Sequence, residues 1–328
     1  MTTFKGIRGT TIEVLSSDPS NPEIGQIWYN SSSGTLKGYK QVNAWSSAAN
    51  MNTARSLLGG AGTQTATIAF GGYYPPGVNT NISESYNGSS WTSTPSLNTG
   101  RRGFVSAGTQ TAALGAGGYT NVPAATYPKA TELWNGSTWT TSPASLNTSR
   151  LAGAGAGTQT AALGFGGFPS IANTESWNGT SWTSVNSLNT GRGYLAGAGT
   201  QTAALSLGGT IGAPGLVNTG ATESWNGTSW TTVNSLNTAR SNIAGSGTQT
   251  SALAFGGALT SSGTSTGATE TWNGTSWTSN PTSLATARQA MGGTGTQTAS
   301  LGFGGSTTTQ VSATEKWTGV GTQTLTAS

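Results

Sequence analysis

The sequence contains no cysteine and no histidine, and aspartate occurs only once, at Asp18. The chain therefore cannot build the common zinc, haem or iron–sulfur sites, a thiol nucleophile or a Ser-His-Asp triad. It has no disulfide framework, so cysteine usage does not indicate a redox compartment. Charged residues make up only 7% of the 328 residues, against about 25% in an average soluble domain. These absences exclude most enzyme classes, and we expect a protein with no catalytic site, metal or cofactor.

Nucleic acids and membranes are also poor matches to the composition. The 13 Lys and Arg residues and 9 Asp and Glu residues give a net charge of only +4, whereas a nucleic-acid binder needs clustered cations. No apolar run approaches the roughly 18 residues of a membrane span. Residues 1–8 lack the apolar core of a signal peptide. We therefore expect no nucleic-acid partner, no membrane span and synthesis in a cytoplasm.

Self-similarity is the main feature of this glycine-rich sequence. The tetrapeptide Gly-Thr-Gln-Thr recurs six times, each time followed at a fixed offset by a Gly-Gly pair. The tetrapeptide begins at Gly62, Gly108, Gly157, Gly199, Gly247 and Gly295. The Gly-Gly pairs begin at Gly71, Gly117, Gly166, Gly208, Gly256 and Gly304.

Three further residue types recur in the same register. Each unit has a glutamate shortly before a first aromatic residue, and an arginine opens the unit. The glutamates are Glu84, Glu132, Glu175, Glu223, Glu270 and Glu315. The arginines are Arg55, Arg101, Arg150, Arg192, Arg240 and Arg288. In five units an Asn-Gly pair and a second tryptophan follow, at Trp91, Trp139, Trp182, Trp230 and Trp277.

A period of roughly 45 residues without a helical pattern predicts propeller blades, each made of four short strands. In the unit that Arg240 opens, the first strand is predicted at residues 241–246 and the second at residues 251–255. The Gly-Thr-Gln-Thr forms the turn between them. The third strand carries the glutamate and the first tryptophan, and the fourth carries the second tryptophan. Between these two strands, Asn-Gly predicts a type I′ hairpin turn.

Six units predict a six-bladed ring, and a propeller must close its ring to bury the faces of its blades. The sixth unit lacks a second tryptophan, but Trp45 precedes Arg55 at the spacing of the second tryptophan in the other units. We therefore expect a strand near residues 42–46 to complete the last blade. The alternative is that residues 320–327 supply this strand.

The repeat resembles the kelch motif. The resemblance covers about residues 36–318 and rests on the arginine, the Gly-Gly pair, the Glu-x-aromatic phrase and the second tryptophan. The segments Met51-Asn-Thr-Ala-Arg55 and Leu236-Asn-Thr-Ala-Arg240 fit the inter-blade phrase of that family. Asn-Gly stands where many kelch repeats have Asp-Pro, which shortens the outer hairpin. The resemblance implies an all-β, six-bladed kelch-like propeller with four antiparallel strands per blade, over residues 36–328.

Residues 1–35 lie outside the repeats. The stretch Ser17-Asp-Pro-Ser-Asn-Pro22 is a turn-rich break, and Gly25-Gln-Ile-Trp-Tyr-Asn30 followed by Gly34-Thr-Leu-Lys-Gly-Tyr39 predicts a hairpin. These phrases resemble a short module near the start of many bacteriophage tail-fibre and virion proteins, especially from marine phages. The resemblance implies that residues 1–35 dock onto other virion proteins.

The repeated residues have a structural interpretation and a functional one. We expect the tryptophans, with Trp45, to fill the gaps between blades, although exposed tryptophans could also stack on sugars. We expect each glutamate to anchor an arginine, although an unpaired ring of arginines could bind an anion. Glycoside hydrolysis needs two carboxylates about 5–10 Å apart, and the repeat glutamates fall on separate units.

The segments between Gly-Gly and glutamate, which we call the variable segments, differ in length and sequence from unit to unit. They are residues 73–83, 119–131, 168–174, 210–222, 258–269 and 306–314. A uniform scaffold with divergent loops on one face is a common way to build a binding surface, but unconstrained loops also drift. Candidate binding residues are Tyr73, Tyr74, Tyr119, Tyr127, Phe168 and Lys129. The proline-flanked phrase Tyr73-Tyr-Pro-Pro76 favours binding.

Together these patterns predict a non-enzymatic bacteriophage virion protein, either a tail-fibre, receptor-binding subunit or a capsid-decorating one. Its variable segments would bind a host surface glycan or another virion protein, and its location would be the extracellular particle. The alternative is a free, lectin-like propeller that binds carbohydrate or peptide. The ligand, the place on a particle and the oligomeric state stay open.

Overall fold

The computed structural model describes residues 12–20, 22–23, 25–75, 77–121, 124–212, 216–260 and 263–325. All regular secondary structure in this part of the chain is β-strand. The chain divides into two compact units: unit 1 comprises Met1–Ala44 and Thr318–Ser328, and unit 2 comprises Trp45–Trp317. This division falls between Ala44 and Trp45, within β3 (Thr35–Ala48), whereas the sequence predicted a domain boundary after residue 35.

Each repeat forms strands in the same order. The first strands are β4 (Gly59–Gly62), β10 (Val105–Gly108), β14 (Ala154–Gly157), β18 (Ala196–Gly199), β24 (Ala244–Gly247) and β28 (Gly292–Gly295). The second strands are β5 (Thr67–Phe70), β11 (Ala113–Ala116), β15 (Ala162–Phe165), β19 (Ala204–Leu207), β25 (Ala252–Phe255) and β29 (Ala299–Phe303).

The third and fourth strands of the repeats carry the first and second aromatic residues. The third strands are β8 (Ser83–Tyr86), β12 (Ala130–Trp134), β16 (Thr174–Trp177), β22 (Thr222–Trp225), β26 (Thr269–Trp272) and β30 (Thr314–Thr324). The fourth strands are β9 (Trp91–Thr94), β13 (Trp139–Ser145), β17 (Trp182–Val185), β23 (Trp230–Val233) and β27 (Trp277–Asn280).

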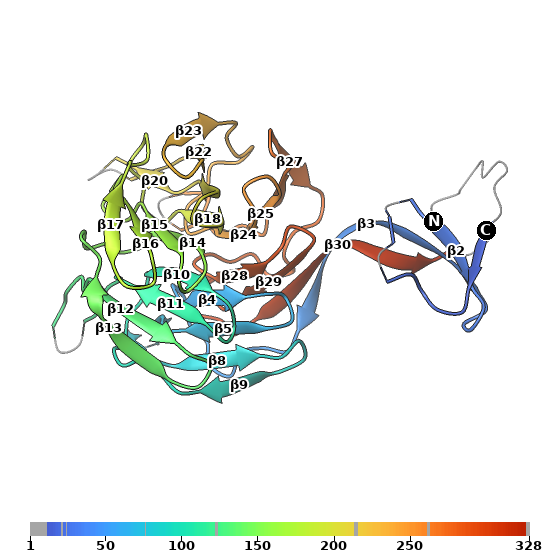
Figure 1. The fold of residues 1–328 in the computed structure, drawn as a ribbon, viewed down its shortest axis with the longest axis horizontal. Helices are drawn as coiled ribbons and strands as arrows, with labels where there is room; N and C mark the ends of the chain where they lie inside the picture. Colours follow the sequence, from blue (N-terminus) through green and yellow to red (C-terminus); the bar gives the residue numbers. More distant parts are fainter. Residues whose placement is uncertain are drawn as a thin grey trace. The chain divides into compact units, whose positions relative to one another are not determined.

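These strands form antiparallel sheets in a propeller-like arrangement (Figure 1). Five four-stranded sheets in the described part of the chain follow the order first, second, third and fourth strand. The sixth repeat belongs to a six-stranded sheet with the order β1-β2-β3-β30-β29-β28. The first strand of each sheet lies beside the first strand of the next, and β28 lies beside β4. Figure 1 shows these first strands nearest the centre of unit 2.

The first strands can meet at the centre because their residues are small. They surround a central channel of about 220 Å³ lined mainly by glycine and alanine. A Cβ atom added at Gly155 in β14 would lie only 2.3 Å from the carbonyl oxygen of Ser106 in β10. Any side chain at this position would therefore push the two strands apart.

The turns on one face of unit 2 satisfy their own polar groups. In the Gly-Thr-Gln-Thr turn that begins at Gly62, the amide of Thr63 donates to the carbonyl of Ala66 at 2.8 Å. The predicted type I′ turn at Asn-Gly is wrong. Trp225 and Trp230 are paired across a four-residue loop, and within its Asn-Gly pair only Gly227 has a positive φ. The side chain of Asn226 closes the loop, because its Oδ1 accepts hydrogen bonds from the amides of Thr228 and Ser229.

The sixth sheet takes its outer strand from the N-terminal side of the repeats. β3 is the neighbour of β30 in the strand order, so β30 lies between β29 and β3. Trp45 of β3 packs on Phe255 and Trp317, with ring centroids 4.9 and 5.5 Å apart. Its indole nitrogen donates to the hydroxyl of Thr269 at 2.9 Å. Trp277 makes the equivalent bond to Thr222 at 3.1 Å.

A cycle of backbone hydrogen bonds runs through all six repeats at the start of the first strands. The amide of Leu57 donates to Ala290, that of Ala290 to Asn242, and that of Asn242 to Tyr194. The amide of Tyr194 then donates to Ala152, that of Ala152 to Gly103, and that of Gly103 back to Leu57. All six residues have φ between 50° and 61°. Because the non-glycine members hold a conformation that L-residues disfavour, the surrounding packing must enforce it.

In unit 1, strand β1 (Glu13–Leu15) pairs in parallel with β2 (Ile27–Asn30), and β2 forms the expected hairpin with β3. Asp18 holds this arrangement together. Its carboxylate accepts hydrogen bonds from the indole nitrogen of Trp28 and the side-chain amide of Asn30. It also forms an ion pair with Lys37 at 2.8 Å. Residues 1–11 of the predicted docking segment lie outside the described residues.

Candidate ligand-binding face

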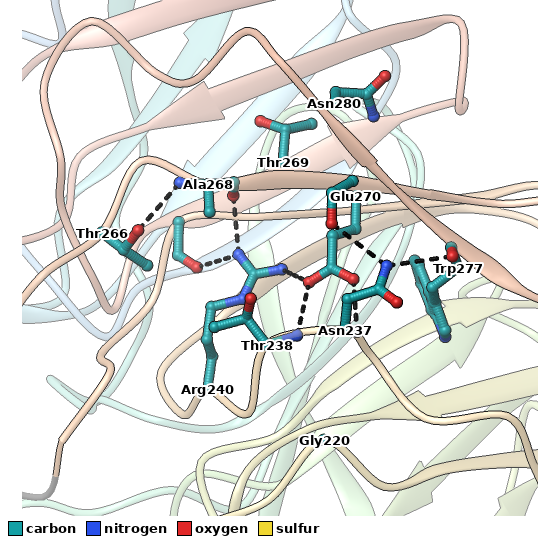
Figure 2. A network of polar contacts seen from close by, with 12 residues as sticks. Gly220, Asn237, Thr238, Arg240, Thr266, Ala268, Thr269, Glu270, Trp277 and Asn280 are labelled. Atoms are coloured by element: carbon teal, nitrogen blue, oxygen red, sulfur yellow. Dashed lines mark hydrogen bonds and ion pairs between the residues drawn. The ribbon is translucent and has the colours of Figure 1, made fainter.

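The repeat arginines and glutamates form buried ion pairs. Figure 2 shows the pair of Arg240 and Glu270, whose Nη2 and Oε1 atoms are 2.7 Å apart. Arg240 also donates to the carbonyl oxygens of Gly256 and Ala268, and Glu270 accepts the amide of Asn237. The other pairs are Arg55–Glu84, Arg101–Glu132, Arg150–Glu175, Arg192–Glu223 and Arg288–Glu315.

The environment of these pairs favours a structural role. Burial lowers the pKa of Arg240, and the charge of Glu270 opposes that shift. Each guanidinium ties the chain that enters a sheet to the end of its second strand and the start of its third. Because the two charges of each pair neutralise one another, the six arginines present no ring of free cations to an anion.

The second-position tryptophans are also part of the framework. Each indole nitrogen donates to a hydroxyl in the neighbouring sheet, as Trp139 does to Ser83 and Trp230 to Thr174. Trp91, Trp139, Trp182, Trp230 and Trp277 are all buried. Trp45 is half-buried in the equivalent place. The five buried rings are therefore covered by neighbouring sheets and cannot stack on a ligand.

The variable segments carry the exposed apolar surface of unit 2. Its exposed large apolar side chains in the described part of the chain all lie in these segments: Tyr74, Val78, Tyr127, Val217 and Leu259. Antiparallel strand order puts these segments on the same face as the arginine-bearing connections, opposite the Gly-Thr-Gln-Thr and Asn-Gly turns. Four of the six variable segments contribute to this set, so the exposed apolar surface of unit 2 in the described residues lies on one face.

One register position divides the variable face into two halves. The residue two positions after the first glycine of each Gly-Gly pair forms an antiparallel β-bridge with the residue that follows the repeat arginine. In the first three repeats this position is aromatic, at Tyr73, Tyr119 and Phe168. In the last three repeats it is small, at Thr210, Ala258 and Ser306. The scaffold is uniform here, so the difference lies in the side chains alone.

The aromatic half contains two groups of contacting side chains, an aromatic cluster around Arg102 and a separate pair of rings. The guanidinium carbon of Arg102 lies 4.5 Å from the ring centroid of Tyr73 and 4.9 Å from that of Tyr119. The ring centroids of Tyr119 and Tyr127 are 5.4 Å apart, and those of Phe168 and Tyr194 are 5.8 Å apart. Burial raises the pKa of Tyr194, partly opposed by the charge of Arg102, so its hydroxyl stays protonated at neutral pH.

The half of the variable face formed by the last three repeats, which have small residues at this position, contains a cavity. A cavity of about 330 Å³ opens there, and its lining includes Thr210, Ala258, Ser306 and Gln289. Tyr194 also lines this cavity, so the cavity adjoins the ring pair of Phe168 and Tyr194. The face therefore offers aromatic rings beside a recess whose walls mix polar and apolar side chains, as small-molecule sites usually do.

The structure brings some of the predicted binding residues together and leaves others apart. Tyr73, Tyr119 and Tyr127 belong to the aromatic cluster around Arg102, whereas Phe168 packs on Tyr194 in a separate pair. Tyr74 is exposed on the short hairpin of β6 (Tyr73–Tyr74) and β7 (Val78–Asn79). Lys129 donates instead to the carbonyl of Asn147 at 2.7 Å. Pro76, part of the motif that favoured binding, lies outside the described residues.

Sequence reasoning missed Arg102 and Tyr194 as members of the face. The signal for Arg102 is the doubled arginine at Arg101 and Arg102, which occurs in no other repeat. The signal for Tyr194 is a large aromatic residue two positions after its repeat arginine, Arg192, where the equivalent residues include Gly103, Ala152 and Ala290.

The described residues lack the features of a metal site and of a membrane-spanning helix. No group of three or more acidic, histidine or cysteine residues gathers there in a way that could hold a metal ion. The same residues contain no helix with the length and apolarity needed to cross a bilayer. The sequence matches no protein-family model and no curated protein.

Proposed function

We propose that this chain is a non-enzymatic virion structural protein of a bacteriophage that attaches through its variable face to a host surface glycan or to another virion protein. It serves as a tail-fibre, receptor-binding or capsid-decorating subunit. The observation that carries the proposal is the concentration of exposed apolar side chains in the variable segments of unit 2. The opposite turns are uniform, and their polar groups are satisfied internally, as at Thr63 and Asn226.

The scaffold in this proposal is a closed, six-bladed kelch-like propeller whose last blade takes its fourth strand from β3. The hydrogen-bond cycle from Leu57 through Ala290 supports closure, because it joins the first repeat to the last. The side chain of Gln64 in the first repeat also donates to the carbonyl of Trp317 in the last, at 2.6 Å. A closed ring gives six loops a fixed frame, which suits recognition by a face rather than by one flexible loop.

Attachment to a particle rests on the N-terminal phrase that resembles phage virion proteins. Unit 1 is a small β-structure of its own, held by Asp18, and contains the described part of that phrase. In the proposal unit 1 docks on the particle, and unit 2 presents its variable face.

Labelling of intact particles tests this proposal. Particles purified from the source culture are treated with a gold-conjugated antibody raised against the segment around Tyr74 and Val78, which are exposed. Label at the tail tip indicates a receptor-binding subunit, and label over the capsid indicates decoration. Unlabelled particles, with the protein free in the medium, would contradict the virion role.

That last outcome would favour a second function, a free lectin-like propeller. One observation supports it independently of any particle: the ring pair of Phe168 and Tyr194 adjoins the recess within unit 2 alone. Such a protein would bind its ligand equally well without unit 1.

A further inference from the structure

Arg102 differs from the six repeat arginines in its partners. Each repeat arginine forms an ion pair with a glutamate, whereas no described residue forms an ion pair or side-chain hydrogen bond with Arg102. The buried, unbonded Nε atom is not the difference, because the repeat arginines share it. The difference is a guanidinium group with no carboxylate beside it.

The rings of Tyr73 and Tyr119 hold this guanidinium in place. Its central carbon lies within 5 Å of both ring centroids, so cation–π attraction takes the place of an ion pair. Only Nε among the nitrogens of Arg102 is buried without a partner, which leaves the two terminal nitrogens open to solvent. A planar fork fixed by two rings can bind a carboxylate through two parallel hydrogen bonds.

The surroundings indicate what carries that carboxylate. Tyr127 lies against Tyr119 and is exposed, so its ring can stack on the face of a sugar. Lys129 is exposed, but its ammonium group already donates to Asn147. The rest of the described variable face is neutral, because the repeat arginines and glutamates pair with one another. A ligand with one isolated negative charge fits this face better than a polyanion does.

We propose that Arg102, held between Tyr73 and Tyr119, binds the carboxylate of an acidic sugar, with Tyr127 as the stacking surface. The inference rests on the proposed function, since it gives the variable face a substrate class: a glycan that contains a uronic or similar sugar acid. It does not depend on where the protein sits on a particle.

A titration with matched oligosaccharides tests this inference on the full chain. The probes are glucose tetrasaccharides in which one residue is glucuronic acid, glucose 6-sulfate or unmodified glucose, together with a neutral peptide that contains one glutamate. Binding is followed through the NMR signals of the tyrosine rings and the arginine Nε–H groups. The wild type is expected to bind the glucuronate probe about 10- to 100-fold more tightly than the glucose probe, as a charge-assisted hydrogen bond implies.

Three variants assign the effect to Arg102. Arg102→Gln should abolish the preference for glucuronate over glucose, and Arg102→Lys should keep only part of it, because an ammonium group lacks the fork. Lys129→Gln, which removes an exposed cation from the same face, should change nothing. All three variants should stay folded, because the buried Arg101–Glu132 pair is untouched.

The outcomes separate this inference from the proposed function. Equal binding of glucuronate and glucose, a preference for the sulfate or peptide probe, or an unchanged preference in Arg102→Gln would overturn the acidic-sugar site. If the wild type still binds host cells in any of those cases, attachment through the variable face stands without it. If it binds neither cells nor sugars, both proposals fail.

Discussion

The amide of Leu57 donates a hydrogen bond to the carbonyl oxygen of Ala290 at 2.8 Å, although these residues belong to the first and last repeats. The bond is one of six that run through all the repeats without a break. The non-glycine members of the cycle have a left-handed conformation that the surrounding packing must enforce. The cycle supports the proposed closed ring, and Trp45 gives a direct test of it.

Replacing Trp45 by alanine should destabilise unit 2, although by less than the same change at the buried Trp277. Trp45 packs on Phe255 and Trp317 and bonds to Thr269, as Trp277 bonds to Thr222. Removal of a packed tryptophan costs about 3–5 kcal/mol of unfolding free energy. Chemical denaturation of Trp45→Ala and Trp277→Ala, followed by circular dichroism, measures both changes. A Trp45→Ala variant as stable as the wild type would show that β3 does not close the last blade.

Removing one partner of the Arg240–Glu270 pair should lower the free energy of unfolding more than removing both charges does. Arg240→Met leaves Glu270 buried without its cation, and such uncompensated charges cost about 3–5 kcal/mol. The double variant Arg240→Met/Glu270→Gln removes both charges and should recover part of that loss. Urea denaturation of the single and double variants tests the coupling. Additive losses in the double variant would mean that the two side chains act independently.

Asp18 should make unit 1 sensitive to acid. Hydrogen bonds from Lys37, Asn30 and Trp28 lower the pKa of Asp18 from 3.8 to about 2. Because the folded pKa is depressed, the carboxylate stabilises unit 1 fully above pH 3.8 and loses that contribution as the pH falls toward 2. The indole N–H signal of Trp28, followed by NMR against pH, should shift in this window, and Asp18→Asn should not show the shift. A midpoint near 3.8 would contradict the bonding around Asp18.

The four-residue Asn-Gly loops should depend on the asparagine oxygen rather than on a positive φ at asparagine. In Asn226→Ala the amides of Thr228 and Ser229 lose their acceptor, which should cost about 1 kcal/mol. Asn226→Asp keeps an acceptor oxygen and should retain most of the stability. Thermal unfolding compares the two. If the aspartate variant lost as much stability as the alanine variant, the side-chain oxygen would not be what closes the loop.

The sequence was a good guide to the strand on which each recurring residue lies. Trp45 could be assigned to its strand because its distance to Arg55 repeats the spacing found in the other units, and the pairing of glutamate with arginine follows from their one-to-one recurrence. The Asn-Gly turn was misjudged because the hairpin rule assumes a two-residue loop, and the serine and threonine residues after the glycine lengthen it. Arg102 and Tyr194 could not be placed, because their meeting depends on how neighbouring sheets pack.

Adsorption to host cells tests most directly the central claim, that the variable face is a binding surface on an inert scaffold. Purified protein is incubated with cells of the source host, and the bound fraction is measured for the wild type and two double variants. Tyr74→Ser/Tyr127→Ser alters exposed side chains of the variable face, and Thr111→Ala/Thr160→Ala alters exposed turns of the opposite face. The account predicts that the tyrosine variant loses at least about tenfold in affinity, as aromatic anchors usually do, while the threonine variant binds like the wild type. Unchanged binding of the tyrosine variant, or a loss confined to the threonine variant, would contradict it.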